Sequence, residues 1–98
     1  MPAYLVSLIT VTNHDKFKEY ASLTAAAGEK YGAKFITRGG GLEVVEGTMP
    51  HPRVVITEFK DKETAKSFFE SPEYLLAKEK RIGACDFNAF IVEGINAV

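Results

Sequence analysis

Residues 53–59 have the sequence Arg-Val-Val-Ile-Thr-Glu-Phe, the run of the chain richest in β-branched and aromatic side chains. Such side chains are enriched in β-strands, so this run predicts a strand. The side chains of a strand point alternately to its two faces, and here both faces are apolar. One face carries Val54, Ile56 and Glu58, and the other carries Val55, Thr57 and Phe59. A strand of this kind needs cover on both sides.

The last apolar run, residues 86–93, has the same two-sided character. Its apolar side chains are Phe87, Ala89 and Ile91 on one face, and Phe90 and Val92 on the other. Two helices can cover only one face of a sheet that contains these strands. We therefore predict that the second face packs against the same face of another copy, in a homodimer with two-fold symmetry.

Two further regions are expected to form strands. Residues 3–11 are rich in β-branched and aromatic side chains, and residues 33–38 and 42–46 are expected to be two strand pieces. Gly39-Gly40-Gly41 separates these two pieces, and a bulge or sharp bend is expected there because glycine weakens a regular strand. Residues 47–52 contain two prolines and are expected to form a turn.

Side chains that can cap a helix precede each expected helical segment: Thr12 or Asn13, then Asp61, then Ser71. Gly32 is expected to end the first helix in the left-handed conformation, and Ser71-Pro72 to restart the second. The resulting order is strand, helix, strand, strand, helix, strand. It predicts an α+β, ferredoxin-like fold (βαββαβ) with an antiparallel sheet and two helices on one face.

The length of 98 residues predicts a single domain, residues 1–98. A net charge of −1 offers no electrostatic reason to expect a nucleic acid or an anionic membrane as partner. Cys85 is the only cysteine, so no intrachain disulfide can form. The chain shows neither the basic start of a signal peptide nor an apolar run long enough to span a membrane, and we therefore expect a cytoplasmic location.

Arg38 is a candidate ligand-binding residue. An arginine can grip a carboxylate or phosphate with two hydrogen bonds, and the neighbouring glycines would let a ligand approach the backbone. The alternative is a surface arginine beside a β-bulge. A phosphate-binding glycine loop is excluded, because such loops lead into a helix and residues 42–44 are expected to continue as a strand.

Glu58 and His51 are the candidate catalytic residues. A carboxylate on an otherwise apolar strand face can become a general base, although a salt bridge with Arg38 or Arg81 is an alternative. His51 lies in the rigid segment Pro50-His51-Pro52, and an imidazole suits proton transfer near neutral pH. The alternative for His51 is a solvent-facing position in a loop.

Aromatic side chains are the candidate walls of a small-molecule pocket. Tyr20, Phe69 and Tyr74 are expected to bind a ligand, together with Phe17 and Phe68, although the tyrosines would serve equally well as boundary residues of the core. The chain has no cluster of Cys and His at metal-binding spacing and no dinucleotide or nucleotide motif, so we expect neither a metal nor a cofactor.

Short motifs spread over nearly the whole chain resemble one known family. They include Met1-Pro2-Ala3-Tyr4, Phe17-Lys18-Glu19-Tyr20, Arg38-Gly39-Gly40, Arg53-Val54-Val55-Ile56, Ser71-Pro72-Glu73-Tyr74 and Val92-Glu93-Gly94. In order and spacing the chain is similar to the domain of unknown function 1330, within the dimeric α/β-barrel superfamily. Relatives often have Trp where this chain has Phe68-Phe69. The resemblance implies a ferredoxin-like fold and a homodimer, and it implies no reaction.

Two functions remain open at this point. One is a cofactor-independent enzyme that acts on a small organic substrate, with Arg38 orienting an oxygen and Glu58 or His51 moving a proton. The other is a non-catalytic dimer that binds a small ligand or a partner. The enzymatic hypothesis requires Arg38, Glu58 and His51 to converge on one cavity.

Overall fold

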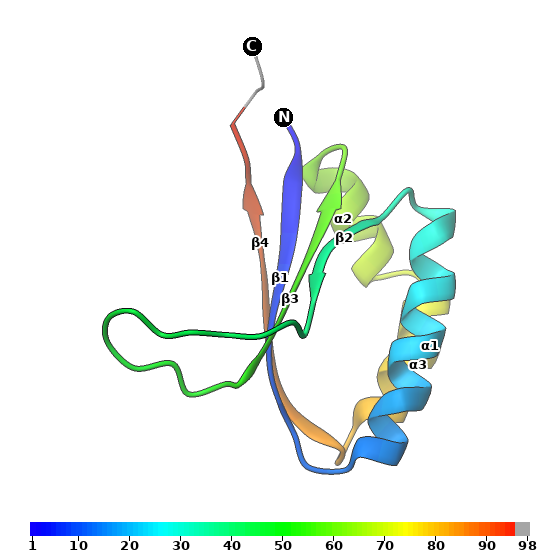
Figure 1. Cartoon of the computed structure of the whole chain (residues 1–98). Helices are drawn as coiled ribbons and strands as arrows, with labels where there is room; N and C mark the ends of the chain where they lie inside the picture. The colour runs from blue at the N-terminus through cyan, green and yellow to red at the C-terminus, as the bar shows by residue number, and fades with distance from the viewer. Residues whose placement is uncertain (96–98) are drawn as a thin grey trace.

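The computed structural model describes residues 1–95, so the expected end of the domain at residue 98 lies outside the described residues. It consists of a four-stranded sheet with helices on one face (Figure 1). The elements in chain order are β1 (Ala3–Val11), α1 (His14–Lys30), β2 (Lys34–Arg38), β3 (Arg53–Phe59), α2 (Lys62–Phe69), α3 (Pro72–Arg81) and β4 (Cys85–Glu93).

The strands lie in the order β2-β3-β1-β4, and every neighbouring pair is antiparallel. This arrangement confirms the predicted α+β, ferredoxin-like fold. The second helical region is split into α2 and α3 at Ser71, as predicted. At each of the three expected caps the side chain accepts a backbone N–H: Asn13 from Lys16, Asp61 from Thr64, and Ser71 from Tyr74.

The two faces of the sheet differ sharply in burial. Along β1, alternate residues from Ala3 to Ile9 are buried beneath the helices, and the residues between them are only half-buried. We call these the helix-covered face and the open face. The pairing of Ser7 with Val55 and with Ala89 extends the same alternation into β3 and β4. The open face therefore carries apolar side chains that the helices do not cover: Val6, Leu8, Val54, Ile56, Phe90 and Val92.

Aromatic side chains form the centre of the core between the helix-covered face and the helices. The ring of Phe68 packs against those of Phe59, Tyr31 and Tyr74, with centroid separations of 5.2, 5.9 and 5.2 Å. Phe68 is 1% exposed. These rings hold α2 and the start of α3 against the sheet, because each buries a large apolar surface.

Residues 39–52, which we call the arm, extend away from the sheet on the side opposite the helices (Figure 1). The prediction of a strand at residues 42–46 is wrong, since no strand forms there. These residues would have to pair with the returning part of the arm, where Pro50 and Pro52 cannot donate to a ladder. Gly39 has a φ of +77°, which turns the chain out of β2. The shift in strand register lies earlier than expected, between Phe35 and Thr37.

Within residues 1–95, no helix combines the length and the apolar character that crossing a membrane requires.

We expect Phe68→Ala to lower the free energy of unfolding by about 3–5 kcal/mol, because it leaves a cavity among three packed rings. Leu76→Ala is the control, since Leu76 is 62% exposed on α3 and its loss should change stability by less than about 0.5 kcal/mol. Urea unfolding at a fixed protein concentration measures both. Equal effects of the two substitutions would contradict this description of the core.

Candidate functional site

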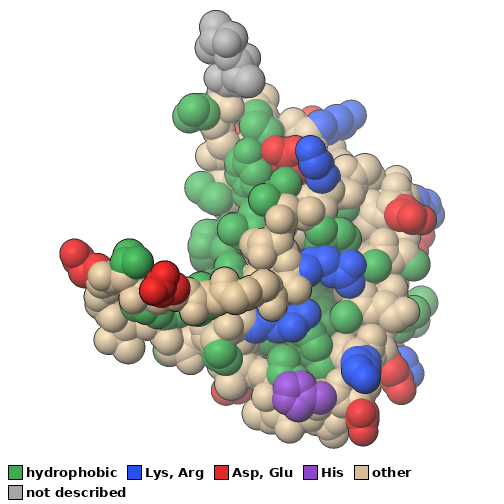
Figure 2. Space-filling model, viewed as in Figure 1, with side chains coloured by type: hydrophobic (Ala, Val, Ile, Leu, Met, Phe, Trp, Pro, Cys, Tyr) green, Lys and Arg blue, Asp and Glu red, His purple; other side chains and the backbone are tan. Residues whose placement is uncertain are grey.

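A cavity lies between the helix-covered face and α1. Its volume is about 40 Å³, which exceeds the roughly 10–15 Å³ that one water molecule needs. A wider groove lined by His14, Lys18, Pro52 and Arg53 adjoins it and shares Phe17 with it. Figure 2 shows Lys and Arg side chains beside apolar ones on the surface between the sheet and α1. The cavity therefore communicates with solvent on its positively charged side.

Arg53, the first residue of β3, is the more deeply placed of two arginines that line the cavity. Its guanidinium lies 5.1 Å from the centre of the Phe17 ring, a cation–π contact. Its Nε atom is buried and has no hydrogen-bond partner among the described residues. A buried donor of this kind is costly unless something binds to it.

Arg38, the last residue of β2, is the second arginine of the cavity. Its guanidinium lies 4.6 Å from the centre of the Phe35 ring, and Nη2 donates a long hydrogen bond of 3.5 Å to the carbonyl of Ala21. Neither Arg38 nor Arg53 forms a salt bridge within residues 1–95, and no Asp or Glu side chain lines the cavity. Two guanidinium groups without a neighbouring carboxylate favour the binding of an anion.

Gly39 makes room for Arg53. A Cβ atom at position 39 would lie 2.5 Å from a terminal guanidinium nitrogen of Arg53, closer than real Cβ contacts allow. The sequence predicted a bend at Gly39-Gly40-Gly41. The first of these glycines, Gly39, also leaves the space that the Arg53 side chain occupies. Gly40 is more open, with 3.7 Å to the nearest atom.

Hydroxyl groups supply the remaining polar surface of the cavity. The phenols of Tyr20 and Tyr74 are buried and lie 2.7 Å apart in a hydrogen bond between α1 and α3. Burial, more than any neighbour, raises the pKa of Tyr20, so this phenol stays protonated and uncharged. Ser7, Thr24 and Thr57 complete the set of hydroxyl-bearing side chains that line the cavity.

The structure brings together three of the six predicted site residues. Arg38, Tyr20 and Tyr74 all line the cavity, as do Phe17 and Phe68. Phe69 does not line it: its ring packs on that of Tyr74, with the ring centres 4.6 Å apart, and lines a separate hollow with Leu5 and Ile91 of the sheet. The predicted ligand-binding role of Phe69 would therefore have to be indirect.

Glu58 and His51 lie on the other side of the sheet. Glu58 lies between the buried Thr57 and Phe59 on β3 and therefore points to the opposite face. Its carboxylate accepts a hydrogen bond of 3.2 Å from the hydroxyl of Tyr4. The suggested salt bridge of Glu58 with Arg38 or Arg81 is absent from the described residues.

His51 bonds through Nδ1 to the Thr10 hydroxyl, at 2.9 Å, and through Nε2 to the Asn88 amide, at 3.2 Å. The partners of the two candidate catalytic residues, Tyr4 and Thr10, are six residues apart on β1, a distance of about 20 Å. Arg38, Glu58 and His51 therefore do not converge on one cavity.

Arg53 is the functional candidate that the sequence analysis missed. The signal was present, because strand alternation places residue 53 on the same face as Val55 and Thr57. What the sequence left undecided was which face of β3 the helices cover. Ser7, Thr24 and Thr57 carry no sequence signal of their own.

The fold and this cavity define a class of small ferredoxin-like proteins with a pocket between the sheet and the helices. Within that class the chain belongs to the family described as Domain of unknown function (DUF1330), whose model matches residues 2–95. The predicted family membership is thus confirmed. No protein with a curated description matches the chain in sequence.

Solved structures with low sequence identity share the fold. A protein of unknown function from Rhodopseudomonas palustris has a TM-score of 0.78 at 16% identity, covering 98% of this chain and 84% of its own. A dimeric ferredoxin-like protein of unknown function from Jannaschia sp. CCS1 has a TM-score of 0.77 at 15% identity, covering 96% and 100%. SnoaB, a cofactor-independent oxygenase from Streptomyces nogalater, has a TM-score of 0.67 at 14% identity, covering 99% and 96%.

We expect Gly39→Ala to destabilise the protein and Gly40→Ala not to. Gly39→Ala should lower the free energy of unfolding by about 1–2 kcal/mol because of its positive φ, and it should also displace Arg53. Gly40→Ala should leave the protein unchanged or stabilise it by up to about 1 kcal/mol, because alanine reduces the entropy of the unfolded chain. Chemical denaturation compares the two. Equal stability of both variants would show that Gly39 can be replaced without strain.

Proposed function

We propose that this protein is a homodimer that binds a small organic anion in the cavity between the sheet and α1. One observation carries this proposal: the buried Nε of Arg53 has no hydrogen-bond partner among residues 1–95, and it shares with Arg38 a cavity that no described acidic side chain lines. A carboxylate bound there would supply the missing acceptor and compensate the partly buried charge.

The apolar walls favour an organic anion over an inorganic one. Phe17, Phe35, Phe68, Leu5 and Val55 line the cavity together with the arginines. Inorganic phosphate or sulfate would leave these walls in contact with water, whereas the hydrocarbon part of an organic anion would bury them. Stacking on Phe17 and Phe35 also holds the two guanidiniums in place, which lowers the entropic cost of binding.

The chemistry of the cavity favours binding over proton transfer. Its lining contains no carboxylate, imidazole, thiol or amine among the described residues. The raised pKa of Tyr20 keeps that phenol from acting as a base near neutral pH. A cofactor-independent enzyme, which the oxygenase from Streptomyces nogalater exemplifies on the same fold, is the alternative. In that case the substrate itself would have to supply the reactive group.

The open face supports the dimer. Phe90 and Val92 are 49% and 47% exposed there, and Val6, Leu8, Val54 and Ile56 complete a continuous apolar surface. Such a surface, left to water by its own chain, is typical of an interface between subunits. The similar protein from Jannaschia sp. CCS1 is described as dimeric. A cytoplasmic location belongs to the same proposal, because the lone Cys85 gives the fold no disulfide to maintain.

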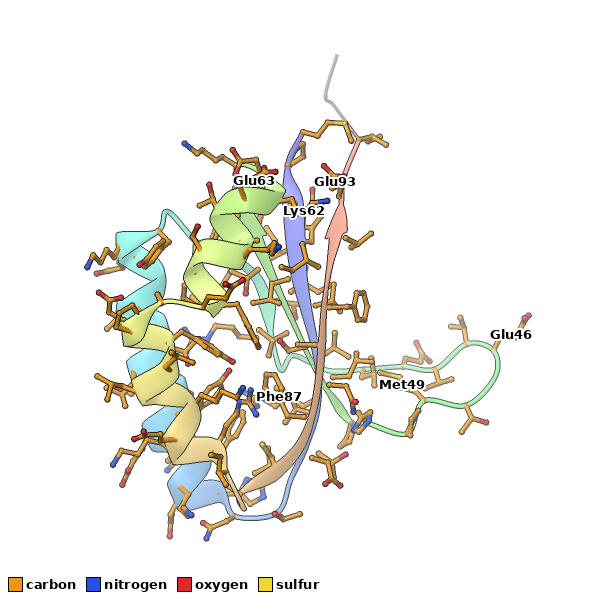
Figure 3. All side chains as sticks on the ribbon, turned by 180° about the vertical axis from the view of Figure 1, so that it is seen from behind. Glu46, Met49, Lys62, Glu63, Phe87 and Glu93 are labelled. Atoms are coloured by element: carbon orange, nitrogen blue, oxygen red, sulfur yellow. The ribbon has the colours of Figure 1, made fainter. Side chains whose placement is uncertain are left out.

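The arm adds a second argument for a copy on the open face. Its apolar residues Leu42, Val44 and Val45 are 47%, 49% and 91% exposed. Figure 3 shows Glu46 at the far end of the arm, well away from the helices. His51 bonds to Thr10 and Asn88 at the base of the arm and so directs it outward from the open face. A second subunit on that face would cover the apolar side chains of the arm.

We expect Arg53→Gln to weaken the binding of small carboxylates at least about 10-fold, because it removes a charge-assisted hydrogen bond. Arg38→Gln should weaken binding less, since Arg38 is more exposed. Lys34→Gln is the matched control, because Lys34 lies on β2 but does not line the cavity. Isothermal titration with benzoate and with hexanoate measures these affinities. If neither anion binds to the wild-type protein, or if all four proteins bind equally, the anion site is wrong.

We expect Phe90→Lys to convert the dimer to a monomer, because it places a charge in an apolar interface. The control is Leu76→Lys, the same kind of substitution on the exposed surface of α3, which should leave the dimer intact. Native mass spectrometry and sedimentation velocity report the masses, and circular dichroism checks the fold. A wild-type monomer, or a Phe90→Lys dimer of unchanged affinity, would refute assembly through the open face.

A further inference from the structure

The floor of the cavity carries two hydroxyl groups. Ser7 of β1 and Thr57 of β3 are 6% and 3% exposed, and both side chains point to the helix-covered face and line the cavity. Their neighbours along the same faces of the two strands are Leu5, Ile9, Val55 and Phe59. Valine or alanine at positions 7 and 57 would suit such surroundings for packing alone, so the two hydroxyls call for a polar partner.

The roof of the cavity carries three more hydroxyl groups. Thr24 Oγ1 is buried and has no hydrogen-bond partner in the described part of the chain, although it lies near enough to lower the pKa of Tyr20. Tyr20 and Tyr74 share one hydrogen bond, which uses only one of their two phenolic protons. The second proton is left for Thr24 Oγ1, which lies near Tyr20, or for a bound molecule.

Arg53 lies away from the hydroxyls of Thr24 and Thr57, whereas Arg38 and Ser7 both lie level with Val55 of β3. Arg53 lies over Phe17, and Arg38 reaches the carbonyl of Ala21, whereas Thr24 follows on α1. The seven residues from Phe17 to Thr24 correspond to about 10 Å along the helix axis. Phe35, Phe68 and the other apolar walls line the cavity along with both groups. A bound molecule would thus meet the guanidinium of Arg53 at one end and the hydroxyls of Thr24 and Thr57 toward the other, with Arg38 and Ser7 between them.

From this arrangement we infer that the ligand is a carboxylate with a hydroxyl or carbonyl oxygen on its uncharged end, held by Ser7, Thr24 and Thr57. The inference rests on the proposed anion site and specifies the chemical class that it selects. A ligand with a plain hydrocarbon end would bury these hydroxyls without partners. A site built to hydrogen-bond an oxygen rejects the analogue that lacks it.

The experiment compares pairs of carboxylates that differ by one hydroxyl group. Suitable pairs are benzoate and 4-hydroxybenzoate, phenylacetate and 4-hydroxyphenylacetate, and hexanoate and 6-hydroxyhexanoate. Isothermal titration measures their affinities for the wild-type protein. We expect the hydroxylated member of at least one pair to bind about 3- to 10-fold tighter, the gain typical of a neutral hydrogen bond.

The nearly isosteric variants Ser7→Ala, Thr24→Val and Thr57→Val test where this preference arises. We expect at least one of them to abolish the preference while it still binds the unsubstituted carboxylate. Ser22→Ala is the control, because Ser22 is exposed on α1 outside the cavity. Urea unfolding of each variant confirms that it folds, and Thr24→Ser supplies a version of Thr24 that retains the hydroxyl and should keep the preference.

The outcomes separate this inference from the proposed function. If carboxylates bind and depend on Arg53, but no hydroxylated member binds more tightly, the anion site stands and the inference is overturned. The inference is also overturned if the preference exists but survives all three cavity substitutions. If no carboxylate of the six binds to the wild-type protein, the proposed function itself fails. Only a preference that depends on the cavity hydroxyls supports both.

Discussion

Strand alternation across a single sheet governs the rest of this structure. Each residue of β1 and β3 faces either the helices or the open face, and the antiparallel register keeps these choices aligned from strand to strand. Ser7, Thr57 and Arg53 reach the cavity for this reason, and Glu58 cannot. The same alternation leaves apolar residues such as Ile56 and Phe90 on the face that the helices do not cover. The cavity on one face and the apolar surface on the other thus both follow from the alternation of side chains along the strands.

The helix-covered side combines a dense aromatic core with a cavity that the core does not fill. Around Phe68 and Tyr74 the rings pack within about van der Waals contact, and this rigidity positions the Tyr20 phenol. Toward β2 the aromatic core ends, and the guanidiniums of Arg38 and Arg53 lie over the rings of Phe35 and Phe17. Stacking on a ring stabilises a guanidinium without consuming its hydrogen-bond donors. Arg38 and Arg53 are therefore held in place while most of their donors stay available to a ligand.

The open side differs in chemistry, because several of its polar side chains are hydrogen-bonded to one another. Tyr4 donates to Glu58, and His51 links Thr10 to Asn88, so these groups support the strands and the base of the arm. Most of the remaining surface is apolar, with the charged Lys34 and Asp86 near its edges. The two proposed functions, assembly and ligand binding, thereby fall on opposite faces of one sheet. Substitutions on one face are expected to leave the other function intact, since the sheet separates them.

The sequence by itself determined the four strands that form, the helix caps and the order of the elements. The signals are local: side-chain periodicity, capping residues such as Ser71, and Gly32 after the first helix each act over a few neighbouring residues. It also showed that the sheet is apolar on both faces. Only the tertiary structure decided which face the helices cover, and hence that Arg38 and Arg53 line one cavity while Glu58 lies on the opposite face. It also decided that residues 42–46 form no strand. Both depend on pairing and packing between distant segments, which local patterns do not encode.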